Sequence, residues 1–89
     1  MNKIPLEVGR VARSKTGRDG GRLFVIISEL DDDFVLIADG QLRKIDRPKK
    51  KRRRHLYALP TILPGIQSGQ ILDAEIRKLL KAAIPKEEG

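Results

Sequence analysis

The chain has 89 residues, enough for one domain with a short extension around a small hydrophobic core. It contains no cysteine, which excludes disulfide bonds and thiolate metal sites and fits a cytoplasmic location. No segment is apolar enough for a secretory signal or a membrane span, so we expect no membrane partner. The net charge of +7 predicts a polyanionic partner instead.

The positive charge is concentrated in one segment. Seven of the 19 Lys and Arg residues lie between Arg47 and Arg54, and the other 12 are balanced by 12 acidic residues. Because packing does not favour adjacent like charges, this basic run predicts binding of phosphate groups. Two other interpretations stay open: a solvated loop that adds solubility, and a nuclear-import signal.

The predicted elements begin after a short leader. Residues 7–13 alternate imperfectly and predict a short strand, and residues 23–27 predict a strand that is apolar on both faces and therefore covered on both sides. The Asp triplet at 31–33 predicts a turn into a third strand over residues 34–38.

The rest of the predicted sheet depends on turn signals. Asp39-Gly40 is typical of a two-residue type I′ hairpin, so the returning strand is expected over residues 41–45, and Pro48 ends it. The basic run, residues 47–54, is expected to be a loop. Residues 55–59 predict a last strand that Pro60 closes and that pairs with the first. Five short strands in so few residues are typical of a small SH3-like barrel.

The C-terminal part changes to a helical period. Residues 60–69 are expected to be a connector, and residues 70–85 an amphipathic helix that ends at Pro85. We thus predict a barrel domain over residues 1–59. The helix should cover the outer apolar face of the barrel, and the alternative is that it binds a partner protein. Its apolar stripe is predicted to comprise Leu72, Ile76, Leu79, Leu80, Ala83 and Ile84.

A loop rich in glycine and cations lies between the first two strands. Gly17, Gly20 and Gly21 permit positive φ or the close approach of a partner. Free backbone N–H groups next to cations suit a phosphate chain. The cations of this loop are Arg13, Lys15, Arg18 and Arg22.

Residues 9–22, followed by an apolar strand, resemble a KOW motif, which occurs in several ribosomal proteins and transcription elongation factors. The continuation through residues 35–51 is similar to a family of small bacterial KOW-domain RNA-binding proteins related to large-subunit ribosomal proteins. The resemblance covers residues 6–59 well and the C-terminal helix more loosely. Gly20 stands where the family commonly has Lys, which removes one loop cation. The resemblance implies a mainly β, five-stranded SH3-like barrel with one C-terminal α-helix.

The kind of nucleic acid follows from the aromatic residues and the resemblance. The chain has only Phe24, Phe34 and Tyr57, and both Phe residues are expected in the core. Stacking of single-stranded bases needs exposed rings, so a protein that binds the backbone of structured RNA fits better. The resemblance favours ribosomal RNA. The predicted RNA-binding residues are Arg13, Lys15, Gly17, Arg18, Gly21 and Arg22 of the loop, and Arg47, Lys49, Lys50, Lys51, Arg52, Arg53 and Arg54 of the basic run. If the barrel brings both groups to one rim, they form a continuous groove.

Other function classes have less support. An SH3 groove for proline-rich peptides needs aromatic walls that this chain lacks. Catalysis is not expected: His55 is the sole histidine, Ser14 and Thr16 have no evident activating partner, and the glycine loop is not a phosphate-binding Walker sequence. We predict no cofactor and no metal, and interpret the Asp triplet as a solvated turn. The main alternative to RNA binding is an assembly module that docks through its C-terminal helix.

Overall fold

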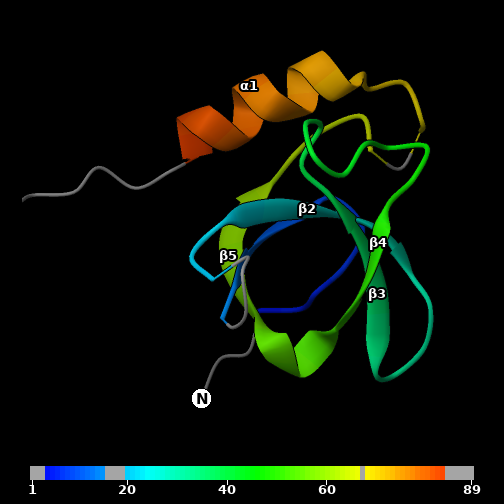
Figure 1. The fold of residues 1–89 in the computed structure, drawn as a ribbon, viewed down its shortest axis with the longest axis vertical. Coiled ribbons are helices and arrows are strands. Elements are labelled where there is room, and N and C mark those ends of the chain that lie inside the picture. The colour runs from blue at the N-terminus through cyan, green and yellow to red at the C-terminus, as the bar shows by residue number, and fades with distance from the viewer. Residues whose placement is uncertain (1–3, 16–19, 67, 84–89) are drawn as a thin grey trace, which may run out of the picture.

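A computed structural model describes residues 4–15, 20–66 and 68–83. Within these residues, five antiparallel strands form one sheet in the order β4-β3-β2-β1-β5, and one α-helix follows. The elements are β1 (Arg10–Ser14), β2 (Leu23–Glu29), β3 (Phe34–Ala38), β4 (Lys49–Arg52), the 3₁₀ turn η2 (Arg53–His55), β5 (Leu56–Ile62) and α1 (Asp73–Ala83). The sheet curls into a barrel and α1 lies across one side of it (Figure 1), which confirms the predicted mainly β, SH3-like barrel with a C-terminal helix. No helix in the described part of the chain is long and apolar enough to cross a bilayer.

Strand β2 is buried on both faces, as its apolar sequence predicts. Phe24 and Ile26 belong to the core inside the barrel. Val25 points to the other side, where it belongs to a second core together with Ile76 and Leu80 of α1. The predicted cover is therefore present: α1 removes the outer apolar face of the sheet from water, which is the main force that holds the helix on the barrel.

Helix α1 begins later than its period predicts. Leu72 occupies the position before the helix, and its N–H donates to Glu75 Oε1 at 3.2 Å, which is half of a capping box. Because the Leu72 side chain is 68% exposed, its assignment to the apolar stripe was wrong. The end of the predicted helix, Ile84 and Pro85, lies outside the described residues.

The strand predicted over residues 41–45 does not form, and Asp39-Gly40 does not make a two-residue hairpin. Asp39 Oδ1 instead accepts hydrogen bonds from the N–H groups of Gln41 and Arg43, both at 2.9 Å. The N–H groups of Asp39 and Gly40 both donate to the Arg43 carbonyl oxygen. These local bonds compete with a sheet ladder, and they fold the segment into a compact turn.

That turn is held against the start of α1. Asp73 Oδ1 accepts a hydrogen bond of 2.8 Å from the Ile45 N–H. Arg77 Nη1 donates to the Gly40 carbonyl oxygen at 2.7 Å. The segment between β3 and β4 therefore joins the barrel to the helix instead of extending the sheet.

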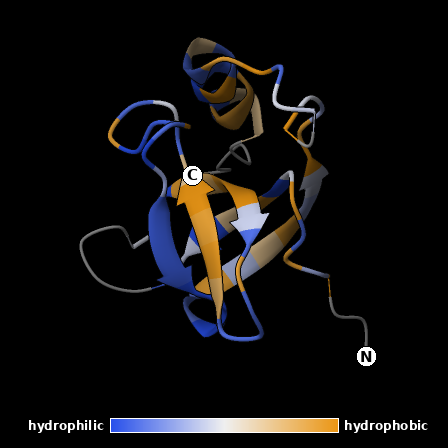
Figure 2. Cartoon of the chain, turned by 90° about the vertical axis from the view of Figure 1, so that its right-hand side faces the viewer, coloured by the Kyte–Doolittle hydropathy of each residue, from blue (hydrophilic) through white to orange (hydrophobic). Residues whose placement is uncertain are grey.

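The basic loop predicted over residues 47–54 contains an edge strand, β4, which pairs antiparallel with β3. The strand is hydrophilic throughout, beside an apolar β3 (Figure 2). Lysine-rich edges are common in natural sheets because they discourage pairing with another chain. Alternation leaves Lys50 and Arg52 exposed and half-buries Lys49 and Lys51, whose aliphatic stems can cover apolar surface.

Strand β5 continues past Pro60, where it was predicted to stop. Its pairing with β1, confirmed by the register Ala12↔Ala58, shifts to Arg10↔Ile62 across an irregularity. A proline at such a bulge removes no ladder hydrogen bond. The Arg10 guanidinium adds a hydrogen bond of 3.2 Å to the Leu59 carbonyl oxygen.

Candidate nucleic-acid interface

The two basic segments meet at one end of the barrel. The Lys15 N–H donates to the His55 carbonyl oxygen at 2.9 Å, directly after the paired part of β1. Lys15 Nζ lies 4.5 Å from the centre of the Tyr57 ring, which is 60% exposed. A hollow of about 860 Å³ lies here. Its charged lining comprises Lys15, Arg52, Arg53 and Arg54, with Asp32 and Asp33.

His55 stands among cations that come from both segments. Partial desolvation lowers the pKa of His55, and the positive charges around it lower the pKa further. Those cations are Arg54, Lys51, Arg52 and Lys15, and we call these four residues the basic rim. The rim therefore concentrates positive charge in one place and disfavours the imidazolium form of His55.

Arg53, a predicted RNA-binding residue, is engaged with the protein itself. Its Nη2 pairs with Glu29 Oε1 at 3.1 Å, and its Nε donates to the Asp31 carbonyl oxygen at 2.9 Å. Nη1 reaches the Leu6 carbonyl oxygen at 3.3 Å. These bonds to the N-terminal segment and to the end of β2 with its following turn make Arg53 a structural residue that fastens η2 to the turn between β2 and β3.

The remaining cations of the basic run are arranged around β4. Arg47 is exposed in the turn before the strand, where its N–H donates to the Lys44 carbonyl oxygen at 3.0 Å. Lys49 is half-buried at the start of β4. Lys50 is exposed on the outer face. The basic run thus contains a strand whose two faces differ in exposure.

Phe34 lies outside the core to which it was assigned, whereas Phe24 is buried as predicted. Phe34 is half-buried on the outer face of the sheet, opposite Arg52 in the register. Lys50 Nζ and Arg52 Cζ lie 4.5 Å and 4.8 Å from its ring centre, which are cation–π distances. The sequence held a signal for this position: Val35 and Ile37 take the inner face, so alternation turns Phe34 outward.

The predicted RNA-binding residues of the glycine loop do not all lie at one site. Gly17 and Arg18 lie outside the described residues, and Gly21 has the positive φ, +85°, that its residue type permits. Only Lys15 of the described loop cations joins the basic rim. Arg13 and Arg22 line a different cleft, beside α1.

The Asp triplet forms the turn that was predicted. Asp31 Oδ1 accepts hydrogen bonds of 2.8 Å from the N–H groups of both Asp33 and Phe34. These bonds lower the pKa of Asp31, because they stabilise its ionised form. Within the described residues, no three His, Asp, Glu or Cys side chains are grouped as metal ligands.

Sequence comparisons identify the family. No family model matches the chain. Large ribosomal subunit protein eL14 of Hyperthermus butylicus is 39% identical over 82 residues, covering 88% of this chain and 78% of that protein. The eL14 of Saccharolobus islandicus strain L.S.2.15 is 35% identical over 79 residues, covering 88% of this chain and 79% of that protein. The chain belongs to the eL14 family.

The eL14 relatives correct one part of the resemblance found in the sequence. The comparisons support a relation to large-subunit ribosomal proteins. These relatives are archaeal, however, so the expected relation to a bacterial family is not supported. Because the matches extend over 88% of the chain, they cannot be confined to residues 6–59.

Proposed function

We propose that this eL14 family member is a ribosome-associated, cytoplasmic RNA-binding protein without catalytic activity. The partner is the phosphate backbone of structured ribosomal RNA, and the contact is made by the basic rim together with Lys50. The observation that carries the proposal is the Lys15–His55 backbone hydrogen bond, which unites cations from two distant segments.

The rim suits a backbone better than a base. Its cations come from the residue after β1, from β4 and from η2, and they spread charge over a surface in a way that favours a chain of phosphates. Tyr57 is the strongly exposed aromatic side chain of this region, and Lys15 already lies over its ring. Recognition by shape and charge is the usual mode for folded RNA.

The alternative, an assembly module that docks through α1, has less support. Ile76 is fully buried and Leu80 nearly so, and both pack against the barrel. The apolar stripe is therefore already occupied within the chain. Docking would have to use the opposite, more polar side of the helix.

The proposal can be tested by a charge-matched pair of variants. Lys51→Gln with Arg54→Gln removes two rim cations and keeps the structural Arg53, whereas Arg43→Gln with Lys44→Gln removes two exposed cations from the turn before β4. Affinity for archaeal large-subunit ribosomal RNA is measured by filter binding over a range of salt concentrations. The rim variant should flatten the slope of log K against log salt by roughly 1.4–1.8, since each phosphate contact contributes about 0.7–0.9.

The control variant should keep a wild-type slope, and circular dichroism should show both variants folded. Equal losses in the two variants would mean that net charge alone attracts RNA. Absence of binding by the wild-type protein at low salt would remove the proposed function.

A further inference from the structure

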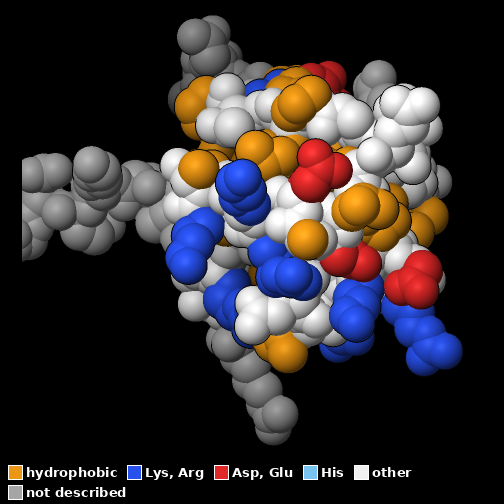
Figure 3. Space-filling model, turned by 90° about the horizontal axis from the view of Figure 1, so that it is seen from above, with side chains coloured by type: hydrophobic (Ala, Val, Ile, Leu, Met, Phe, Trp, Pro, Cys, Tyr) orange, Lys and Arg blue, Asp and Glu red, His pale blue; other side chains and the backbone are white. Residues whose placement is uncertain are grey.

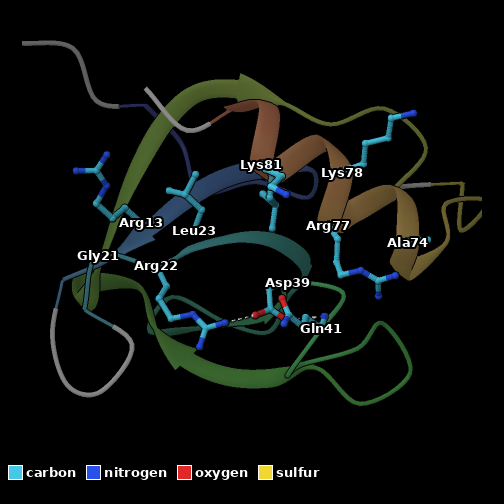
Figure 4. A pocket seen from close by; sticks show the side chains of 11 residues that line it. Arg13, Gly21, Arg22, Leu23, Asp39, Gln41, Ala74, Arg77, Lys78 and Lys81 are labelled. Atoms are coloured by element: carbon cyan, nitrogen blue, oxygen red, sulfur yellow. Dashed lines mark hydrogen bonds and ion pairs between the residues drawn. The ribbon is translucent and has the colours of Figure 1, made fainter. Parts of the chain in front are cut away.

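A second cleft lies between α1 and the barrel, away from the basic rim. It has a volume of about 630 Å³, which is within the range of small-molecule sites. Its walls come from the end of the glycine loop, the start of β2, the Asp39 turn and one side of α1 (Figure 4). The function proposed above does not use this cleft.

The cleft is strongly cationic. Five basic side chains line it against one acidic residue, Asp39. Seen from above, Lys and Arg side chains gather on one side of the face that α1 forms (Figure 3). The five cations are Arg13, Arg22, Arg77, Lys78 and Lys81.

Asp39 offsets only one of these five positive charges. Its side chain is 6% exposed, and Oδ1 already accepts two backbone hydrogen bonds. Oδ2 accepts a 3.0 Å hydrogen bond from Arg22 Nη2. The carboxylate therefore orients Arg22 from below, while the 38% exposed Arg22 side chain keeps other N–H groups for a ligand.

Two guanidinium groups in the cleft, those of Arg22 and Arg77, are held by hydrogen bonds to the protein. Arg22 extends across the cleft towards Asp39, and Arg77 descends from α1 on the opposite side (Figure 4). Arg77 uses Nη1 on the Gly40 carbonyl oxygen. The Nε of Arg13 is buried and has no hydrogen-bond partner among the residues that the structure describes. Planar, oriented N–H donors of this kind match phosphate oxygens.

The cleft also has an apolar part. Leu23, Ala74 and Leu80 line it together with the cations. Inorganic phosphate would leave this apolar surface exposed to water, and so would the carboxylate side chain of an acidic peptide. A flat heterocycle joined to a phosphate satisfies both parts of the lining.

We propose that this cleft binds a nucleoside phosphate, with the phosphate on Arg22, Arg77 and Lys81 and the base over Leu23. The ligand is either a free nucleotide or a nucleotide that is turned out of an RNA strand. Only the second source rests on the proposed RNA-binding function. In that case the cleft is a second contact, separate from the basic rim.

The test is an NMR titration of the full chain with adenosine 5′-monophosphate. The nucleotide should shift the backbone amides of Gly21, Gln41, Ala74 and Lys81. Adenosine alone and inorganic phosphate alone should each bind at least about tenfold more weakly, because each satisfies one part of the lining only. Lys81→Glu should weaken nucleotide binding at least about fivefold, whereas Lys44→Glu, an equal charge change outside the cleft, should leave it unchanged.

Two RNA hairpins, one with a single bulged nucleotide and one fully paired, separate the sources. Shifts at the cleft amides with the bulged hairpin alone assign an RNA nucleotide, and shifts with adenosine monophosphate but neither hairpin assign a free nucleotide. Nucleotide shifts confined to residues 50–55, or equal cleft shifts with a tetraglutamate peptide, would overturn the proposal. The titration with adenosine monophosphate needs no RNA. It therefore tests nucleotide binding by the cleft even if the basic rim does not bind RNA.

Discussion

The backbone N–H of Lys15 and the carbonyl oxygen of His55 are joined by a 2.9 Å hydrogen bond, which sets the His55 imidazole among the cations of the basic rim. Partial desolvation, and then the positive field of the rim, lower the pKa of His55 in the free protein. A phosphate bound to the rim would offset that field and raise the same pKa. Binding of RNA should therefore be accompanied by proton uptake.

Affinity for RNA should accordingly increase as the pH falls from about 8 to about 5.5, around the ordinary histidine pKa of about 6.5. As the pH falls, the affinity for RNA begins to rise near the pKa of His55 in the complex, because His55 is protonated at a higher pH in the complex than in the free protein. Fluorescence anisotropy at constant ionic strength measures it. His55→Gln should remove this pH dependence, and parallel pH profiles of wild type and variant would contradict the coupling.

Arg53 and Arg54 are neighbours with opposite expected roles. Arg53→Gln removes the ion pair to Glu29 and two bonds to backbone carbonyls, so the free energy of unfolding should fall by about 2 kcal/mol. Arg54 is exposed and no hydrogen bond or ion pair fixes it among the described residues, so Arg54→Gln should change stability by less than about 0.5 kcal/mol.

Urea denaturation and RNA binding of the two folded variants separate these roles. Arg54→Gln should weaken RNA binding with an unchanged denaturation midpoint. Arg53→Gln should lower the denaturation midpoint. Where this variant is folded, its affinity for RNA should be closer to that of the wild type than the affinity of Arg54→Gln is. A reversed pattern would show that Arg53 is the contact residue and Arg54 the structural one.

The different roles of Arg53 and Arg54 could not be predicted from the sequence, although most of the fold could. Residues 23–27 and 34–38 are almost entirely apolar, and this composition predicts buried strands. The identical charge of Arg53 and Arg54 gives no hint that one of them reaches Glu29. Such partners depend on chain segments that only the folded barrel brings together.

The wrong elements have a similar origin. Asp39-Gly40 has the composition of a hairpin, but the Asp39 carboxylate instead accepts hydrogen bonds from the N–H groups of Gln41 and Arg43 and from the distant Arg22. Residues 49–52 have low intrinsic strand preference, and they form β4 because β3 offers an unpaired edge. A competing local turn, fixed further by Arg22, thus replaces the hairpin, whereas in β4 a tertiary contact overrides local preference.

Gly40 should be the most sensitive to substitution among the described glycines with positive φ. Its φ is +77°, and a Cβ there would collide with the Asp73 carbonyl oxygen and crowd Arg77. Gly40→Ala should therefore lower the free energy of unfolding by more than the roughly 1–2 kcal/mol of left-handed strain alone. Gly69→Ala is the matched control, because Gly69 has φ +71° and open space at its Cβ. Equal midpoints in thermal denaturation would contradict the close packing of the turn on α1.

The packing of α1 on the barrel can be tested with two apolar residues at its N-terminal end. Ile76 is fully buried between α1 and the barrel, so Ile76→Ala should cost about 2–5 kcal/mol through lost contacts and a residual cavity. Leu72 is 68% exposed at the helix start, so Leu72→Ala should cost less than about 0.5 kcal/mol. Urea denaturation measures both effects.

The same pair distinguishes the helix as a cover from the helix as a docking element. If α1 only covers the sheet, Leu72→Ala should leave RNA binding unchanged, and Ile76→Ala should reduce it only in proportion to the unfolded fraction. A stable, fully folded Ile76→Ala protein would mean that this side chain is not needed by the barrel. Its apolar stripe would then be available to a partner protein, as the alternative function requires.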